Sequence, residues 1–493
     1  MTSLPRQLYT ASATRQLDQL AIKDHNIPGY SLMYQAGEAV FQVLQQSFPL
    51  AKRLLVCCGA GNNGGDGYVI ARLAQQAGLD VKLVSLVDID CLSGDAAQAC
   101  KDWRSLGHQP VTFSASLLKN TDVVIDALLG TGLDREVTGE WRQLIELINQ
   151  SAVPVIAVDV PSGLSADTGS LFGIAVQADI TVSFIGLNRG LLTHQGPDYT
   201  GQIMFYDLGV PASVYQSVSE EARLLNWDDI KQQLQPRPKN SHKHNFGHLL
   251  VVGGDHGMAG AVRLAAEAAL RTGAGLVTVI TRPEHVAMIT AGCPELMVTG
   301  TETGQIPHHI MNNVQAIVIG PGLGRGDWGM NLLSQVLQSG VAKLLDADAL
   351  NLLGPDDGVQ QDWVLTPHPG EAAHLLATKS ADIQHDRFLA IEQLAQTYGG
   401  TIILKGCGSL VKSGHEVPAI CPYGNPGMAT AGMGDVLSGI IGALMAQGLS
   451  QSDAARLGVC IHALAGDRAA GLAPRGLIAA DLFVEIRKLV NPD

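Results

Sequence analysis

Residues 53–67 read Arg-Leu-Leu-Val-Cys-Cys-Gly-Ala-Gly-Asn-Asn-Gly-Gly-Asp-Gly. The first six predict a buried strand, and we expect a helix over residues 65–76 directly after the glycine-rich turn. Glycines at a helix start leave backbone amides open to an anion. Five glycines within nine residues would be a large entropic cost for a turn with no other role, so a ligand-binding turn is favoured over a bare one.

A second glycine-rich turn lies about 370 residues further along the chain. Residues 425–435 read Asn-Pro-Gly-Met-Ala-Thr-Ala-Gly-Met-Gly-Asp, and they open an apolar helix that we expect over residues 434–447. Each of the two turns carries a carboxylate beside its glycines. Two such turns predict two nucleotide-handling domains on one chain, and therefore two linked chemistries.

Size and composition set the class of protein. A chain of 493 residues exceeds what one core usually supports, so two or three domains are expected. The formal net charge of −14 argues against non-specific binding of nucleic acid or of an anionic membrane. Eight scattered cysteines without a CxxC pair indicate reduced thiols, and residues 1–26 lack the apolar core of a signal peptide. A cytoplasmic protein without a membrane span is therefore predicted.

Strand and helix signals alternate twice along the chain, which predicts an α/β fold with parallel strands and right-handed crossovers. Two amphipathic helices are expected first, the second of them over residues 30–48. The strands predicted in the first half cover residues 53–58, 80–87, 122–128, 153–158, 180–185 and 202–207. Those predicted in the second half cover residues 249–252, 276–281, 316–319, 343–346, 364–367 and 401–405.

A linker separates the two halves. Residues 235–244 are polar, contain prolines and show no periodicity, so we expect one domain over residues 1–220 and another over residues 226–493. Three histidines at positions 242, 244 and 248 could form a metal site. A solvated linker is favoured, because no nearby cysteine or acidic cluster completes a set of ligands.

Carboxylates stand where two further strands of the first half end. Asp126 lies in the third predicted strand, before a flexible loop that starts at Gly130, and Asp159 follows the fourth. Ligands of open α/β sheets bind at the carboxyl ends of strands. The glycine-rich turn and these two strand ends therefore converge on one pocket, which could also hold a hard cation.

An ordinary dinucleotide site is the alternative for the first turn, because residues 59–67 contain a GxGxxG spacing. Such a site needs an acidic residue about 20 positions on to hold a ribose hydroxyl, and Asp88 or Asp90 could serve. That alternative leaves Asp66 and the two asparagines before it unexplained.

Over residues 8–215 these segments resemble the Rossmann-like epimerase domain of the NAD(P)H-hydrate repair family, whose Asn-Asn-Gly-Gly-Asp motif is highly specific. The resemblance implies that the hydrated nucleotide is held by Asn62, Asn63, Gly64, Gly65 and Asp66, and by Gly130, Thr131, Gly132, Leu133, Asp134, Arg135 and Glu136. It also implies a K⁺ site made of Asn63, Asp126 and Ser162. Asp159 would face the nicotinamide ring, and we assign to it the proton transfer that changes the configuration of the hydrated carbon.

The second half offers a matching pair of features. Lys405 ends a predicted strand and precedes the turn Gly406-Cys407-Gly408-Ser409, so one ammonium and a bare turn suit a diphosphate. An ordinary β-turn beside a surface lysine is the alternative. Asp435 stands in the first turn of the last apolar helix, where an acid is often only a stabilising charge worth about 0.3–1 kcal/mol. Its small neighbours leave room for a ligand, so we favour catalysis.

The sequence Gly432-Met433-Gly434-Asp435 resembles the ribokinase-like superfamily, in which the aspartate takes a proton from a hydroxyl that attacks a nucleotide phosphate. Further motifs narrow the resemblance, over residues 226–490, to the ribokinase-like α/β dehydratase domain of the same repair family. These motifs are residues 253–254, 257–261, 264–266, 269–277, 320–324, 346–351 and 366–371. Met258 stands where many relatives are expected to have an aromatic side chain.

The second resemblance implies a set of contacts. Ala261, Gly322, His368 and Asp435 would contact the hydrated nucleotide. The co-substrate ADP would be held by Lys405, Gly406, Cys407, Gly408, Ser409 and Gly434, and Mg²⁺ would serve as cofactor. Asp435 would activate the ring hydroxyl to attack the terminal phosphate, after which loss of phosphate restores the nicotinamide.

Two assignments in this half stay open. His368 could contact the ligand or cap the helix start at Pro369, and contact is favoured. Asp346 and Asp348 could hold Mg²⁺ through water, whereas Asp348 could instead only cap the next turn.

Together the resemblances imply a bifunctional enzyme that epimerises (R)- and (S)-NAD(P)HX and dehydrates the (S) epimer with ADP, releasing AMP and phosphate. A vitamin or sugar kinase with an accessory nucleotide-binding domain is the alternative. A scaffold in RNA-related assemblies is disfavoured by the acidic balance and by the presence of Asn63, Asp126 and Asp159. The expected partners are NADHX, NADPHX and ADP, without nucleic acid or membrane, in a homo-oligomer.

Overall fold

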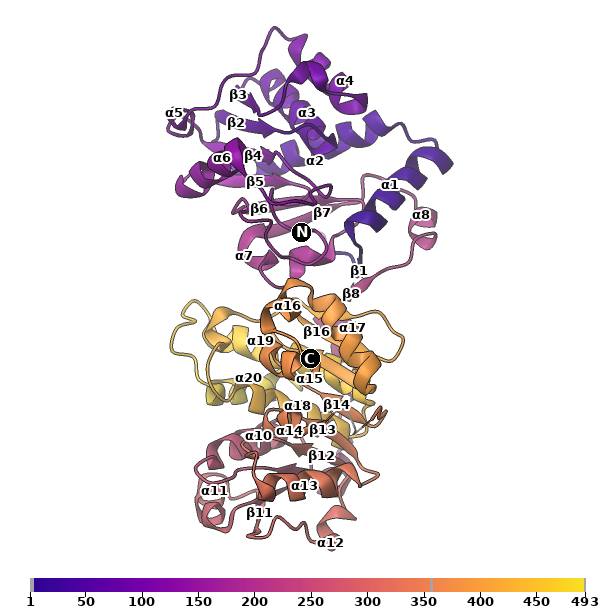
Figure 1. Ribbon diagram of the computed structural model, residues 1–493, viewed down its shortest axis with the longest axis vertical. Helices are drawn as coiled ribbons and strands as arrows, with labels where there is room; N and C mark the ends of the chain where they lie inside the picture. Colours follow the sequence, from indigo (N-terminus) through magenta and orange to yellow (C-terminus); the bar gives the residue numbers. More distant parts are fainter. Residues whose placement is uncertain (1–3, 355–357, 492–493) are drawn as a thin grey trace. The chain divides into compact units, whose positions relative to one another are not determined.

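The computed structural model describes residues 4–354 and 358–491. The chain divides between Ala222 and Arg223 into two compact units. Each unit has its own sheet flanked by helices, as the alternating strand and helix signals predict (Figure 1).

The sheet of the first unit is parallel throughout and follows the order β3-β2-β4-β5-β6-β7. Its strands are β2 (Arg53–Cys58), β3 (Asp80–Ser85), β4 (Val123–Ala127), β5 (Val155–Val158), β6 (Ile180–Phe184) and β7 (Gln202–Tyr206). The strand order reverses between β2 and β4. This topological switch point opens a crevice at the carboxyl edge of the sheet, which is where ligands bind in such folds.

Helices pack on both faces of this sheet. One apolar core contains buried residues of α1, α2, α3 and α4, and a second contains residues of α5 and α6. The prediction of an amphipathic helix over residues 30–48 is confirmed by α2. The helices are α1 (Ala11–Asp24), α2 (Gly29–Ser47), α3 (Asn62–Gln76), α4 (Gly94–Arg104), α5 (Ala115–Leu118), α6 (Gly139–Gln150), α7 (Gly196–Thr200) and α8 (Ala212–Gln216), and the short β1 (Gln7–Leu8) precedes them.

The sheet of the second unit runs in the order β8-β17-β16-β15-β14-β13-β12-β9-β10-β11. Its strands are β8 (Ala222–Leu224), β9 (His248–Val252), β10 (Leu276–Thr281), β11 (Met297–Gly300), β12 (Ala316–Ile319), β13 (Ala342–Leu345), β14 (Trp363–Leu365), β15 (Thr401–Leu404), β16 (Ser409–Ser413) and β17 (Ala419–Cys421). All neighbours are parallel except that β16 runs antiparallel to β15 and to β17. The short strands β16 and β17 were not predicted.

The longest apolar helix, α18, lies inside the second unit. It packs against α10 and α19, and nearly all of its residues are buried because apolar side chains occupy every side of it. The helices are α9 (Trp227–Ile230), α10 (Ala259–Thr272), α11 (Val286–Gly292), α12 (His308–Met311), α13 (Asp327–Leu337), α14 (Asp348–Leu352), α15 (Pro369–Leu375), α16 (Ser380–His385), α17 (Arg387–Tyr398), α18 (Met433–Ala446), α19 (Gln451–Ala470) and α20 (Leu482–Leu489). Within residues 4–354 and 358–491, no helix combines the length and apolar character that a membrane crossing requires.

Candidate active sites

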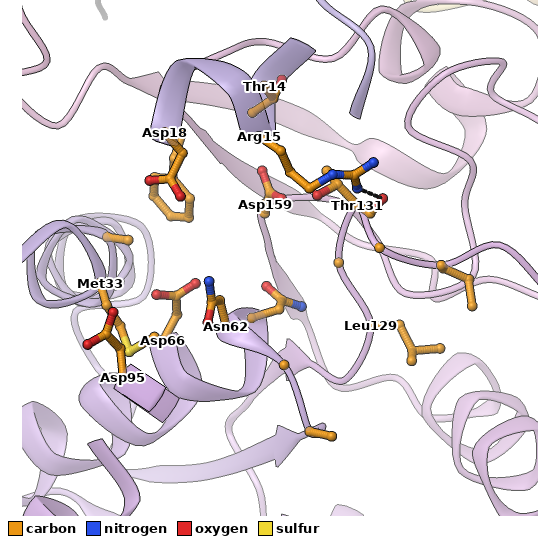
Figure 2. Close-up of a pocket in the computed structure, with 18 of the residues that line it drawn as sticks. Thr14, Arg15, Asp18, Met33, Asn62, Asp66, Asp95, Leu129, Thr131 and Asp159 are labelled. Atoms are coloured by element: carbon orange, nitrogen blue, oxygen red, sulfur yellow. Dashed lines mark hydrogen bonds between the residues drawn. The ribbon is translucent and has the colours of Figure 1, made fainter. Parts of the chain in front are cut away.

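A cavity of about 570 Å³ opens in the first unit around the switch point (Figure 2). Helix α3 begins at Asn62, three residues earlier than predicted, so the asparagines of the turn belong to its first turn. The residues predicted to bind nucleotide that line this cavity are Asn62, Asn63, Asp66, Gly130, Thr131, Gly132, Leu133, Asp134, Arg135 and Asp159. The structure therefore brings the glycine-rich turn, the loop after β4 and the end of β5 to one place.

Three of the predicted nucleotide ligands do not line the cavity. A side chain at Gly64 would overlap the backbone of Gly59, and one at Gly65 would lie 2.5 Å from the methyl carbon of Met33. These two glycines allow α3 to pack closely against its neighbours. Glu136 is exposed, and its side chain borders Gly173.

Asp159 has an unusual backbone conformation at the end of β5. Its φ angle is +66°, in the left-handed region that few non-glycine residues adopt, and its N–H donates to Val182 O at 2.7 Å. Strained backbone of this kind is concentrated at functional sites. Burial raises the pKa of the Asp159 carboxyl to about 7, against a backbone hydrogen bond at Phe184, and the nearby Asp18 adds to the rise.

Part of the cavity wall was not predicted from the sequence. Helix α1 contributes Thr14, Arg15, Asp18 and Ile22, and Asp95 comes from α4. Thr14, Asp18 and Ile22 recur at a spacing of four residues, which places them on one side of a helix. That spacing shows a shared face, but nothing in the local sequence tells whether the face meets a core or a cavity.

The residues of the expected K⁺ site lie beside this cavity and deeper in the unit. The Asp126 carboxylate is fully buried and accepts from Ser162 Oγ at 2.6 Å and from Ser162 N at 2.8 Å. Burial raises its pKa to about 6, against these hydrogen bonds. The side-chain amide of Asn63 is buried, and neither of its polar atoms has a hydrogen-bond partner among the described residues. A buried side-chain amide normally has a hydrogen-bond partner, and a bound water or ion is one way to supply it.

The second unit gathers charges at the carboxyl ends of β13 and β15. Lys405 Nζ lies 2.7 Å from Asp346 Oδ1, and Ser438 Oγ donates to Asp346 Oδ2 at 2.7 Å. A side chain at Gly434 would come within 3.4 Å of Lys405 Nζ, so the first turn of α18 faces this ion pair. Burial raises the pKa of Asp435 to about 7, Asp346 adds to the rise and Lys405 opposes it. The predicted Lys405, Gly434 and Asp435 are therefore brought together.

His368 caps helix α15. Its Nδ1 accepts from Gly370 N at 2.9 Å, and its backbone N–H donates to Glu371 Oε2 at 2.8 Å. The capping alternative is thus what the structure shows. The imidazole nevertheless remains half exposed and lines a cleft of about 380 Å³ together with Asp348 and Glu371. Glu371 also lies 3.7 Å from Lys405 Nζ, which connects this cleft to the ion pair.

The other expected contacts to the hydrate lie close together in the second unit. A side chain at Gly322 would come within 2.7 Å of Met258 Cβ and 3.3 Å of Ala261 Cβ. The loop that carries Gly322 is held by Asp348, whose Oδ2 accepts from Gly324 N at 3.0 Å. Asp348 therefore orders a neighbouring glycine loop, and the N-cap of α14 is Ala347 rather than Asp348.

The turn expected to hold ADP is a hairpin between β15 and β16. Gly406 and Gly408 have φ angles of +141° and +62°, which favour glycine, and Ser409 Oγ donates to Gly406 O at 3.0 Å. The guanidinium of Arg387, fully buried on α17, donates to Lys405 O at 3.3 Å. Arg387 therefore holds the base of this turn by a hydrogen bond, and Cys407 within the turn is exposed.

The structure gives no support to a ribose-binding role for Asp88 or Asp90, or to a metal site made of the three histidines. Asp88 caps a short helix by accepting from Asp90 N, and neither residue lines the cavity. His248 Nε2 lies 2.7 Å from Thr278 Oγ1 inside the sheet. No group of three or more histidine, cysteine or acidic side chains is placed to hold a metal in the described parts of the chain.

Two family models match the chain. A model described as YjeF-related protein N-terminus matches residues 29–190, and one described as NAD(P)H-hydrate dehydratase matches residues 249–488. The first match begins after helix α1, so Thr14, Asp18 and Ile22 lie outside it.

Full-length relatives are similar along the whole chain. The bifunctional NAD(P)H-hydrate repair enzyme Nnr of Coxiella burnetii is 47% identical over 486 residues, which cover 98% of this chain and 99% of the relative. The enzyme of the same name from Escherichia coli is 42% identical, over 100% of this chain and 95% of the relative. Among solved structures, a ribokinase-like superfamily protein of Enterococcus faecalis gives a TM-score of 0.51 at 29% identity, covering 55% of this chain and 96% of its own. The ribokinase-like fold predicted for the carboxy-terminal half is confirmed.

Proposed function

The chain belongs to the family of bifunctional NAD(P)H-hydrate repair enzymes, and from this premise we propose which of its residues carry the two reactions. It is an enzyme that repairs hydrated nicotinamide nucleotides, with an epimerase unit followed by a dehydratase unit. One observation carries the residue assignments. Each unit holds a carboxylate with a pKa near 7, Asp159 or Asp435, at the carboxyl edge of its own sheet.

In the first unit, Asp159 would transfer protons at the hydrated ring carbon. It lines the cavity, and a pKa near the working pH lets one carboxyl both give and take a proton. The first turn of α3 and the loop over residues 130–135 would hold the rest of the nucleotide, with exposed amides facing its phosphates. Gly64, Gly65 and Glu136 would support this site from outside the cavity rather than touch the ligand.

Potassium would be held by Asn63, Asp126 and Ser162. The donor set fits: all three side chains end in oxygen, Asp126 supplies negative charge, and the buried Asn63 amide lacks a partner among the described residues. A bound K⁺ would supply a fixed positive charge beside the loop that follows β4. No proton-transfer step requires it.

In the second unit, Asp435 would take the proton from the ring hydroxyl while that oxygen attacks the terminal phosphate of ADP. The bond between that phosphorus and the bridging oxygen breaks, and AMP leaves. The phosphorylated hydrate then loses phosphate from the ring carbon and a proton from the neighbouring carbon, which restores the nicotinamide double bond. Ala261, Gly322 and His368 would hold the hydrate.

The adenine nucleotide would occupy Lys405, the hairpin turn of residues 406–409 and the amide of Gly434. Lys405 supplies the positive charge, since burial disfavours its charged form but Asp346 and Glu371 outweigh that effect and raise its pKa. Mg²⁺ would neutralise the phosphates, and Asp348 could face it through water because its carboxylate lines the cleft. Asp346 would instead position Lys405.

A coupled assay tests the function. Each purified hydrate epimer is incubated with the full chain and with ADP or ATP, and the return of reduced-nicotinamide absorbance is followed. We expect both epimers to be consumed completely with ADP. Consumption of one epimer only would show an inactive first unit. In a parallel incubation with ATP and hydroxylated vitamins or sugars, a stable phosphorylated product would favour the kinase alternative, which the full-length relatives do not favour.

We place the enzyme in the cytoplasm, a reducing compartment, which agrees with Cys421 and Cys460 lying side by side as thiols with sulfurs 3.9 Å apart. We expect a homo-oligomer, which sedimentation velocity would measure.

A further inference from the structure

Helix α1 supplies a wall of the first cavity that no motif of the sequence accounts for. Thr14, Asp18 and Ile22 line it from one side of the helix. Figure 2 shows Asp18 directed from α1 into the space that Asp66 enters from α3, with Asp159 close by at the end of β5. Asp18 and Asp159 thus enter the same cavity from two different elements, helix α1 and the end of strand β5.

The charged groups around Asp18 are mostly acidic. Asp66, Asp95 and Asp159 line the same cavity, and Arg15 on α1 is turned toward the loop after β4, donating to Thr131 O at 3.2 Å. Burial and then Asp95 raise the pKa of Asp18, and Asp18 in turn raises the pKa values of Asp66 and Asp159. Carboxyls that disfavour one another's ionisation titrate as a coupled group.

Inverting a hydrated ring carbon by exchange of its hydroxyl for water requires groups on two sides of the ring. Adding water to the enamine of a reduced nicotinamide leaves the hydroxyl on the carbon next to nitrogen. Such a carbon inverts when the hydroxyl leaves from one face and water adds to the other. The leaving oxygen needs a proton donor and the arriving water needs a base, so a single carboxyl on one side serves only one of these roles.

We propose that Asp18 is the second proton-transfer residue of this cavity, acting across the ring from Asp159, and that the configuration inverts by exchange of the ring hydroxyl for water. The proposal rests on the proposed epimerase function of the first unit. It adds Asp18 as a catalytic residue, opposite proton-transfer roles for Asp18 and Asp159, and exchange of the hydroxyl as the route of inversion.

Each step of the exchange balances. Protonated Asp18 gives its proton to the ring hydroxyl, the carbon–oxygen bond breaks, water leaves, and the nitrogen lone pair forms a carbon–nitrogen double bond. A water on the side of Asp159 then adds to the same carbon, the double-bond electrons return to nitrogen, and the Asp159 carboxylate takes the proton released. One water leaves and one enters, and the two carboxyls exchange protonation states, so the reverse inversion uses the opposite roles.

The first test compares two variants on the same helix. Asp18→Asn in the full chain is expected to slow epimerisation by about 100-fold or more, as loss of a positioned acid or base does. Asp24→Asn, at the exposed end of α1, removes an equal charge outside the cavity and should leave the rate unchanged. Epimerisation by Asp18→Asn within threefold of the unaltered chain would overturn the inference. Absence of epimerisation in the unaltered chain would instead contradict the proposed function.

The second test uses the unaltered chain and does not depend on how a variant folds. One epimer is incubated in water enriched in oxygen-18, and the inverted product is analysed by mass spectrometry against a sample without enzyme. Exchange of the hydroxyl predicts one solvent oxygen in every inverted molecule. Inversion that keeps the original oxygen, as ring opening and reclosure would, overturns the proposed route.

Discussion

In each unit the pKa of one carboxyl is raised to about 7, but the neighbouring charges differ between the two units. Burial and the nearby Asp18 raise the pKa of Asp159 to about 7, whereas burial and Asp346 do the same for Asp435 against the opposing charge of Lys405. In the first unit, several carboxylates line one cavity. In the second unit, Lys405 and the start of helix α18 lie beside Asp435. The surroundings therefore reveal more about each reaction than the pKa does.

The difference agrees with the two chemistries. Exchange of a hydroxyl for water moves protons and needs groups that give and take them, and the acids that line the first cavity provide such groups. Transfer of a phosphoryl group moves negative charge, so it needs a cation and open amides near the transferred group. Because the sites lie in separate units with separate cores, each should respond to substitution without the other.

The largest effect is expected for Asp435→Asn. Loss of the general base should lower dehydration by 10²–10⁴, or roughly 3–5 kcal/mol of transition-state stabilisation, while epimerisation continues at its normal rate. Dehydration of the (S) epimer with ADP and epimerisation of the (R) epimer are measured on the same preparation. Equal losses in both activities would contradict independent sites.

Asp159→Asn should give the mirror result. Epimerisation should fall by about 100-fold or more because one of the two proton-transfer groups is gone, and dehydration of the pure (S) epimer should be retained. The rate of interconversion is followed by chromatographic separation of the epimers, corrected for the uncatalysed rate. An unchanged rate would remove Asp159 from the mechanism.

Asp159→Asn should also change stability with a defined sign. Because the folded-state pKa of about 7 lies above the usual carboxyl value, the folded unit binds more protons than the unfolded chain between about pH 4 and 7, so this group lowers stability as pH rises through that window. At pH 8 the free energy of unfolding should therefore be higher for the variant than for the unaltered chain, by an amount on the order of 2 kcal/mol. This figure already allows for the partial exposure of the carboxyl to the cavity. Denaturant unfolding at pH 5 and pH 8 measures the difference, and no change with pH would contradict the assignment.

Lys405→Met should affect binding more than chemistry. Loss of a charged contact to a phosphate is expected to raise KM for ADP by about 10–100-fold, equivalent to ~1.5–3 kcal/mol. Because Lys405 lowers the pKa of Asp435, its removal should also move the pH at which kcat is half-maximal upward. The pH profile of epimerisation should not move. Lys488→Met, an exposed lysine on α20, serves as the matched control.

Much of the fold could be predicted from the sequence, because parallel strands buried on both faces read as short apolar runs between glycine turns. The strand at 53–58 and the one at 316–319 agree with the structure to the residue. Helix α3 was predicted to begin three residues late, since glycines and asparagines look like loop until their amides are seen facing a cavity. Strands β16 and β17 were missed because their apolar runs, Leu410–Val411 and Ala419–Cys421, are only two and three residues long.

The site could be predicted only where a motif lies at a strand end or at a helix start. Asp159, Lys405 and Asp435 follow this rule, and the structure places each at a carboxyl edge. Asp18 and Arg387 do not follow it. One sits on a helix whose direction depends on tertiary packing, and the other is a buried arginine whose carbonyl partners come from a segment 17 to 21 residues away. Residues that act through packing leave no local signal in the sequence.

The smallest effect is expected at two glycines where the chain itself tolerates a side chain. A methyl at Gly61 would meet no atom within 4 Å, and one at Gly434 would come no closer than 3.4 Å to Lys405. Gly61→Ala and Gly434→Ala should therefore leave stability within about 1 kcal/mol, which thermal unfolding checks.

If phosphates approach these backbones, Gly61→Ala should raise KM for the hydrate in epimerisation and Gly434→Ala should raise KM for ADP, each by roughly tenfold, because the methyl occupies space that the ligand needs. An effect on KM in one unit alone would show that only that unit holds its anion by bare amides, and the comparison between the two sites would then rest on their carboxylates.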